Sequence, residues 1–268
     1  MSSYLSHSPP AYGDQADGLR RLFAGSRQRL VPVAFNAHVD CAGVVLERLS
    51  AAFTELGART LVVDAADNAP LPSELVDIDI GAAIETLGPS VSYLAARGLP
   101  LRHVNPRGSC AGWLAAVEDA APQTDVILLH ANARDLVRLI GDRDVCPVLL
   151  TSLLGDSLTD AYASMKLLSQ RAGLMAFDLM VGMKGRPKRA QRMAERLGSC
   201  ADSFLGAVLR QIALIDCNPP HNAAAGPALS RLAGSQLLPR TDDGSTAASQ
   251  ELAARSAQGA AGLSHTPY

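Results

Sequence analysis

Residues 30–64 read LVPVAFNAHVDCAGVVLERLSAAFTELGARTLVVD, and this stretch decides the fold. Leu30–Phe35 is apolar and β-prone, and Ala42–Leu56 repeats apolar residues at helical spacing. Arg59–Asp64 is a second apolar run, and it ends on an acid. A strand, a loop, a helix and another strand in this order predict a βαβ unit whose two strands are parallel.

The same alternation continues along the chain, apart from residues 74–87, whose pattern is ambiguous. We expect further strands at Leu99–Val104, Asp125–Ala131, Cys146–Ser152, Ala176–Met183 and Gln211–Asp216. We expect helices at Ala111–Ala121, Arg134–Ile140, Leu158–Arg171, Lys188–Leu197 and Asp202–Leu209. Strands written as continuous apolar runs between helices predict an α/β fold, with a mostly parallel sheet covered by helices on both faces.

The composition fits one sizeable α/β domain: 268 residues, 48% of them hydrophobic and 19% charged, with a net charge of −2. A near-neutral chain lacks the basic face that broad nucleic-acid binding needs. The first residues lack a signal peptide's pattern, and no apolar run is long enough to span a membrane. Five isolated cysteines are interpreted as reduced thiols of a cytosolic protein: Cys41, Cys110, Cys146, Cys200 and Cys217.

The chain divides by composition into three parts. Residues 1–29 form an N-terminal arm, residues 30–218 the α/β domain, and residues 219–268 a flexible low-complexity tail rich in Ala, Gly, Ser and Pro. Leucines in that tail are interrupted by Gly234 and followed by Pro239, so they are a weak membrane signal.

Four segments carry a resemblance to a known family: DQADGLR at 14–20, ELGARTLVVDA at 55–65, TDAYASMKLL at 159–168 and DSFLG at 202–206. In their order and spacing they resemble the MinD-like regulators of flagellar number called FlhG or FleN (also YlxH). The chain looks like a degenerate member of that family. The resemblance implies the P-loop NTPase fold of the MinD/ParA superfamily, with a nucleotide site in the loop after the first strand.

The departures from the family's motifs fall on that nucleotide site. Ala37 stands for the signature lysine, Ala42 for the P-loop lysine and Gly43 for the hydroxyl that binds Mg²⁺. Asp64 keeps the acid after the second strand. The Walker B aspartate becomes His130, and the asparagine that contacts adenine becomes Gly182. The degenerate site is therefore expected to comprise Ala37, Cys41, Ala42, Gly43, Asp64, His130 and Gly182.

Losing these contacts removes most of the affinity for a nucleotide. Each lost charged contact is worth roughly 1.5–3 kcal/mol, and Asp40 would repel the phosphates. The sequence predicts a pseudo-ATPase without a nucleotide or metal cofactor, and no enzyme. The alternative is a regulator whose unconventional loop still binds ATP and Mg²⁺. Loop residues His38, Asp40 and Cys41 are too crowded to be expected as a metal site.

The arm carries the one intact functional motif. In the family this motif is thought to dock on FlhF, a signal-recognition-type GTPase, and to stimulate its hydrolysis. Gln15 would orient the attacking water, as a glutamine does in other GTPases. The resemblance gives the partner-binding residues as Asp14, Gln15, Ala16, Leu19, Arg20 and Leu22. The alternative is that the short arm simply packs on its own domain.

The expected function is regulation of flagellar biosynthesis, meaning flagellar number or placement, through a FlhF-type GTPase. A different class of function is also open: a non-catalytic scaffold for flagellar switch proteins or for a flagellar transcription regulator. We expect a cytoplasmic protein that a partner recruits to the cell pole or the inner membrane face. Its own membrane contact should be weak or indirect, and it should bind no nucleic acid.

Overall fold

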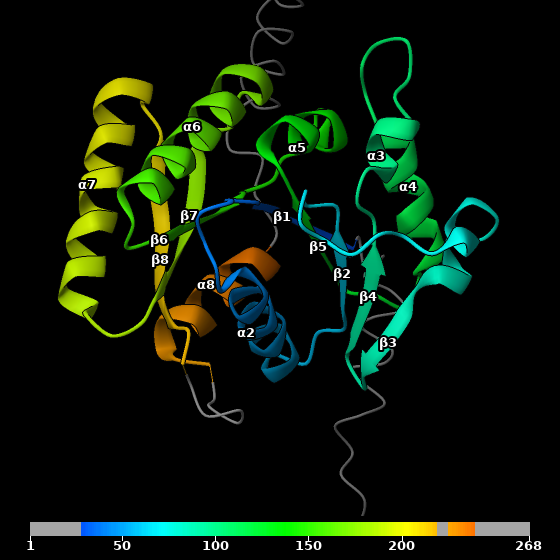
Figure 1. Ribbon diagram of the computed structural model, residues 1–268, viewed down its shortest axis with the longest axis horizontal. Helices are drawn as coiled ribbons and strands as arrows, with labels where there is room; N and C mark the ends of the chain where they lie inside the picture. The colour runs from blue at the N-terminus through cyan, green and yellow to red at the C-terminus, as the bar shows by residue number, and fades with distance from the viewer. Residues whose placement is uncertain (1–27, 219–224, 239–268) are drawn as a thin grey trace, which may run out of the picture. The chain divides into compact units, whose positions relative to one another are not determined.

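Within the part of the chain that the structure describes, eight strands form one sheet (Figure 1). The computed structural model describes residues 28–218 and 225–238. The strand order is β3-β4-β2-β5-β1-β6-β7-β8, and every neighbouring pair is parallel except β3 with β4. The strands are β1 (Arg29–Ala34), β2 (Thr60–Asp64), β3 (Glu85–Gly88), β4 (Val91–Ala95), β5 (Val126–Ala131), β6 (Val148–Ser152), β7 (Ala176–Met183) and β8 (Val208–Asp216). The predicted α/β class is confirmed.

Helices cover both faces of this sheet. On one face lie α2 (Ala42–Glu55) and α8 (Pro227–Leu237), and they contact each other. The other face carries α3 (Leu99–Arg102), α4 (Ala111–Ala120), α5 (Ala133–Ile140), α6 (Gly155–Ala172) and α7 (Pro187–Leu205). Two short 3₁₀ turns, η1 (Glu74–Asp77) and η2 (Gly81–Ala83), lie between β2 and β3.

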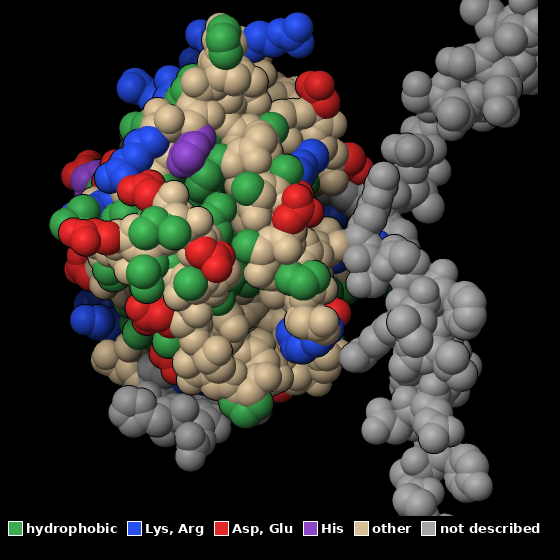
Figure 2. Space-filling model, turned by 90° about the vertical axis from the view of Figure 1, so that its right-hand side faces the viewer, with side chains coloured by type: hydrophobic (Ala, Val, Ile, Leu, Met, Phe, Trp, Pro, Cys, Tyr) green, Lys and Arg blue, Asp and Glu red, His purple; other side chains and the backbone are tan. Residues whose placement is uncertain are grey.

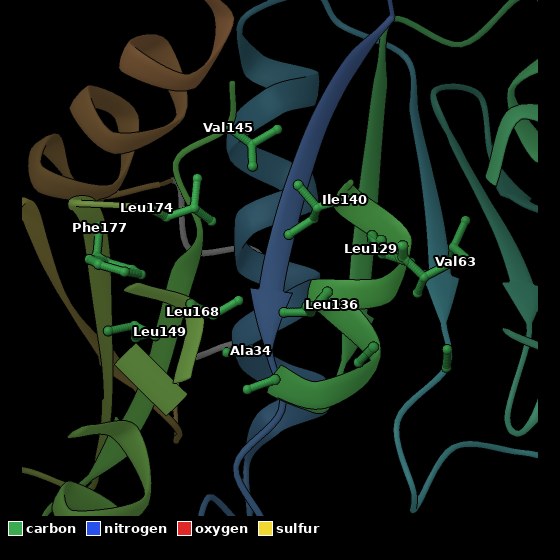
Figure 3. Close-up of a cluster of buried hydrophobic side chains, with 14 of the residues drawn as sticks. Ala34, Val63, Leu129, Leu136, Ile140, Val145, Leu149, Leu168, Leu174 and Phe177 are labelled. Carbon is green, nitrogen blue, oxygen red and sulfur yellow. The ribbon is translucent and has the colours of Figure 1, made fainter. Parts of the chain in front are cut away.

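The core has two layers because successive side chains of a strand point to opposite faces. In β5, Ile127 and Leu129 pack under α5, whereas Val126 and Leu128 face α2. Figure 3 shows the first layer, where Leu136 and Ile140 of α5 lie over the sheet. A buried parallel sheet of this kind needs apolar residues on both faces, which explains the continuous apolar runs in the sequence.

The strand predicted at Leu99–Val104 is wrong. Leu99–Arg102 forms the short helix α3, which begins after Gly98 in a left-handed conformation (φ 76°) and carries Pro100 in its first turn. A proline in the first helical turn loses no hydrogen bond, so it is compatible with a helix start. The strand beside β2 is β4, which pairs with it from Val91 to Ala95.

The two helices predicted at Lys188–Leu197 and Asp202–Leu209 are one helix, α7. It continues through Gly198, where an added Cβ would lie 3.6 Å from Leu209 of β8. The helix ends at Gly206 in a left-handed conformation (φ 63°), and Leu209 already belongs to β8. The basic and the later segments therefore share one surface helix.

The interpretation of residues 219–268 as a flexible tail is wrong for the segment that forms α8. Leu229, Leu232 and Ala233 are buried against the face of the sheet that also carries α2. These leucines are therefore core residues of the domain rather than a membrane signal. In the described residues, no helix combines the length and the apolar character that crossing a bilayer requires.

One buried charge ties α8 to the sheet. Asp178 of β7 is fully buried, and both of its carboxylate oxygens accept hydrogen bonds from Arg210 of β8, at 3.3 and 3.0 Å. Gln236 of α8 donates to the same carboxylate at 2.8 Å and to the Cys146 carbonyl at 3.0 Å. A buried carboxylate is stable only when it is paired in this way.

Replacing the cation of this pair should destabilise the domain. Arg210→Met leaves the Asp178 carboxylate buried without its charge partner, which costs about 3 kcal/mol of unfolding free energy. Arg102→Met is the control, because Arg102 and Asp77 form an exposed pair whose loss costs less than about 1 kcal/mol. Urea unfolding measures the unfolding free energy of both variants. Equal losses of unfolding free energy would contradict the role given to Asp178.

Candidate functional site

The predicted site residues come together at the carboxyl edge of the sheet. In the parallel pairing Asp64 of β2 lies opposite His130 of β5, and Gly182 of β7 lies opposite Ser152 of β6. The loop from Phe35 to Cys41 follows β1 at this same edge and leads into α2. Ligands of open α/β sheets bind at this edge, so the predicted position of the site agrees with the general rule.

The loop after β1 is held closed by its own hydrogen bonds. Asn36 is buried, and its side-chain amide donates to the carbonyls of Leu150 and Ser157, both at 2.8 Å. Its Oδ1 accepts the His38 N–H at 3.0 Å, and its backbone carbonyl accepts the Val39 N–H at 3.1 Å. Two loop N–H groups that could have pointed at an anion therefore bond within the loop.

The first turn of α2 continues this pattern. The N–H of Ala42 donates to the Val39 carbonyl at 3.1 Å, and Cys41 precedes the helix without a side-chain capping bond. The turn carries neither a lysine nor a hydroxyl, because Ala42 and Gly43 occupy its first two positions. A phosphate at this helix end would meet only the partial charge of the helix dipole.

Cys41 and Cys217 form a disulfide, so the interpretation of these two cysteines as reduced thiols is corrected. Their Cα atoms lie 6.0 Å apart although the residues are 176 positions apart in the sequence. The bond connects the loop before α2 to the residue that follows β8. Cys110, Cys146 and Cys200 form no disulfide among the described residues.

Gly182 lies against this disulfide. A Cβ added there would come within 2.8 Å of the Cys41 sulfur and 3.3 Å of the Cys217 sulfur. Only a residue without a side chain fits this position while the bond is present. The glycine at position 182 is thus explained by close packing, and the bond occupies the space that a side chain would fill.

The disulfide should contribute measurably to stability. Cys217→Ser removes a cross-link between distant parts of the chain, and such links typically stabilise by about 2–4 kcal/mol by constraining the unfolded state. Cys200→Ser is the control, because Cys200 is exposed and free. In urea unfolding, a reductant should lower the unfolding free energy of wild type to that of Cys217→Ser. If a reductant leaves the unfolding free energy of wild type unchanged, the bond does not stabilise the domain.

Asp64 and His130 form a hydrogen-bonded pair at this edge. His130 Nδ1 lies 2.8 Å from Asp64 Oδ1, and Tyr93 of β4 donates its hydroxyl to Asp64 Oδ2 at 3.2 Å. Only 2% of His130 is exposed, and its Nε2 has no hydrogen-bond partner among the described residues. Its ring packs edge-on against Phe35, with 5.7 Å between the ring centroids. Asp64 also accepts the Ala66 N–H at 3.3 Å, so its carboxylate is engaged by three neighbours.

Tyr93 provides a pH signature of this network. Burial, followed by the negative charge of Asp64 and the hydrogen bond to it, raises the pKa of the Tyr93 phenol well above its usual value. The folded protein therefore keeps a proton that the unfolded chain loses at a pH of about 10. Because the folded state then binds more protons, this contribution to stability is full below that pH and is lost as the pH rises further.

Tyr93→Phe should weaken this alkaline loss. The variant should also lose about 1–2 kcal/mol at neutral pH, because the hydrogen bond to Asp64 disappears. Tyr162→Phe is the matched control, since it retains Tyr93 and with it the steep alkaline loss. Unfolding free energy measured from neutral pH to above pH 10 tests this. Identical slopes in wild type and Tyr93→Phe would show that the network does not hold the proton.

A cavity of about 570 Å³ lies beside the loop, within the usual size range of small-molecule sites. Its lining includes Ala37 from the loop, Asn132 and Arg134 at the start of α5, and Asp67 and Asp160. The Asn132 amide donates to Asp67 at 3.3 Å and to Asp135 at 3.0 Å. One arginine beside two acids does not make this cavity an anion site.

The predicted site residues fall into separate groups. Cys41 and Gly182 meet at the disulfide, and Asp64 with His130 forms a separate hydrogen-bonded pair. Ala37 lines the cavity beside the loop. The predicted partner-binding residues 14–22 lie outside the described residues. Sequence reasoning missed Asn36, Tyr93 and Cys217. A buried asparagine directly after an apolar strand was the one available signal, since such a side chain needs hydrogen-bond partners.

Comparison with known proteins finds solved structures that have the same fold. No protein-family model matches the chain, and no curated protein matches it either. Solved structures do match: the MinD cell division protein of Aquifex aeolicus shares 15% identity at a TM-score of 0.52, over 79% of this chain and 99% of that chain. Cobyrinic acid a,c-diamide synthase of Mycobacterium smegmatis, with bound ADP and magnesium, shares 16% identity at a TM-score of 0.55. The match covers 79% of this chain and 94% of that chain.

A third match has even lower identity. The putative plasmid partition protein of Borrelia burgdorferi, bound to AMPPNP, shares 7% identity at a TM-score of 0.54, over 78% of this chain and 98% of that chain. At such identities the likeness shows the fold alone. The eight-stranded sheet and its helices have the fold of the MinD/ParA P-loop ATPases.

Proposed function

We propose that this chain is a regulator of flagellar biosynthesis that has the MinD/ParA fold but acts as a pseudo-ATPase. In this proposal it binds a FlhF-type GTPase through its arm and stimulates that partner's hydrolysis. The α/β domain serves as a scaffold, without a nucleotide or metal cofactor. Flagellar switch proteins or a flagellar transcription regulator are further candidate partners, and nucleic acid is not among them.

The observation that carries the pseudo-ATPase part is the closed loop after β1. Its N–H groups at His38, Val39 and Ala42 bond within the loop instead of pointing outward. The residues at this edge also do not fit a nucleotide with Mg²⁺, because the loop and the first turn of α2 supply no lysine and no hydroxyl. The ADP and AMPPNP complexes belong to the structural neighbours and are not carried over to this chain.

The regulatory part is supported by the sequence resemblance in residues 14–20. Gln15 would complete the partner's active site by orienting the attacking water. The structure adds one fact: Gln28 donates to the Ala121 carbonyl at 2.6 Å, so the arm joins the domain at the end of α4. That junction lies at the amino ends of the parallel strands, because Arg29 begins β1. The disulfide lies at their carboxyl ends, because Cys41 follows the end of β1.

A cytoplasmic location, with recruitment to the pole or the inner membrane face by a partner, belongs to the same proposal. Disulfides are rare in a reducing cytosol. The proposal therefore requires that the Cys41–Cys217 pair is not needed for the arm to act. Cys217→Ser should stimulate a partner GTPase as well as wild type does.

The decisive experiment is the GTPase rate of the cognate FlhF-type protein with wild-type chain, with Gln15→Ala and with the isolated peptide 1–29. Wild type and peptide should raise the rate at least about tenfold, and Gln15→Ala should not, because the water-orienting amide is lost. Gln191→Ala is the matched control, since Gln191 lies exposed on α7 and contacts Glu195. No stimulation by wild type would reject the activator and favour a scaffold.

A further inference from the structure

The segment between β2 and α4 exposes an unusual share of apolar side chains. Half of the large hydrophobic residues that are exposed in the described part of the chain fall in residues 71–104. Ile78 is 84% exposed and Leu71 is 72% exposed. We call this set the η1 surface: Leu71, Leu75, Ile78, Leu87, Leu101 and Val104. Figure 2 faces this side of the molecule and shows hydrophobic and acidic side chains next to one another.

A cavity opens beside Ile78 of this surface. Its volume is about 240 Å³, and it is lined by Val76, Asp77, Ile78, Ile80, Leu99, His103 and Trp113. An apolar cavity of about 150 Å³ is enough for a benzene ring. The cavity can therefore accept one phenyl or leucyl side chain. Apolar surface of this extent beside a cavity is typical of a docking surface.

The charge of this surface favours a basic occupant. Residues 71–104 carry four acids, Glu74, Asp77, Asp79 and Glu85, against two arginines, and one of these, Arg102, pairs with Asp77. Residues 18–27 of the same chain read GLRRLFAGSR, with three arginines and no acid. Leu19, Leu22 and Phe23 supply the apolar side chains that such a surface would cover. The two segments are thus complementary in charge and in apolar character.

The point where the arm joins the domain brings it close to this surface. Gln28 bonds to Ala121 at the end of α4, and a Cβ on Gly81 of η2 would lie 3.7 Å from the Ala120 carbonyl. Trp113 lies eight positions before Ala121, about 12 Å along the helix. The five residue steps from Gln28 back to Phe23 span up to about 17 Å. Phe23 can therefore reach the cavity.

We propose that residues 18–27 dock on the η1 surface of their own chain, with Leu22 and Phe23 directed to the cavity beside Trp113. A short tether gives the segment a local concentration in the millimolar range, which favours it over a second copy or a free partner. Docking would cover part of the segment that is proposed above to act on a GTPase. The surface argument itself does not depend on that partner.

Hydrogen exchange followed by mass spectrometry tests the docking on the full chain and on a chain that lacks residues 1–24. Peptides from residues 71–104 should exchange at least about threefold more slowly in the full chain. Leu22→Asp with Phe23→Asp in the full chain should match the truncation. Leu5→Asp is the control, because it adds a charge to the arm outside the docking segment.

A second measurement uses Trp113, the only tryptophan of the chain. A synthetic peptide of residues 14–27 should change the Trp113 emission of the truncated chain in a saturable way. It should not do so with Ile78→Asp, a substitution at an exposed position, whereas Leu238→Asp should bind normally. Equal exchange in full and truncated chains would overturn the proposal. Protection that appears only as protein concentration rises would also overturn it, because a second copy would then be the occupant.

Neither measurement involves a GTPase. A negative result here therefore leaves the proposed function standing. A failure of GTPase stimulation likewise leaves the docking intact.

Discussion

The parallel register of β4, β2, β5, β1, β6, β7 and β8 is the constraint on which the rest of this structure depends. Parallel strands end at the same edge, so residues far apart in the chain meet there. The register places Asp64 beside His130, and it carries Cys217 next to the loop that holds Cys41. Every feature of the candidate site follows from this alignment. Buried apolar side chains on both faces stabilise it.

At this edge, where open α/β sheets bind ligands, groups within the chain pair with one another. Asn36 uses its side chain to close the loop after β1, and the disulfide fills the space above Gly182. Asp64 is engaged by His130 and Tyr93. Polar groups that would be costly to bury unpaired are thus satisfied without a ligand, apart from His130 Nε2.

Much of the fold could be predicted because buried parallel strands leave a strong signal. Ala176–Met183 was predicted with the bounds that β7 has, since an apolar run of that length has few other interpretations. The strand predicted at Leu99–Val104 was wrong because the four-residue helix that forms there is too short to show helical periodicity. Helix α8 was not predicted because Ala, Gly and Ser dominate its segment, and its burial depends on tertiary contacts.

The candidate site was predicted less completely than the fold. Its position could be predicted from the resemblance and from the strand ends. The Cys41–Cys217 bond could not be predicted, because only the strand register brings together these residues, which are 176 positions apart. Tyr93 was missed for a similar reason: β4 was not predicted, so nothing placed this side chain next to Asp64. Pair contacts across a sheet depend on register, which sequence patterns alone specify weakly.

Titration calorimetry of the full chain with Mg-ATP, with and without a reductant, tests the central claim most directly. The account predicts no saturable heat in either state, because reduction opens the disulfide but restores neither lysine nor hydroxyl to the loop. Saturable binding with a micromolar dissociation constant, equivalent to about −8 kcal/mol, would contradict it. Such a result would mean that the loop after β1 opens and holds the nucleotide through contacts that differ from those of its structural neighbours.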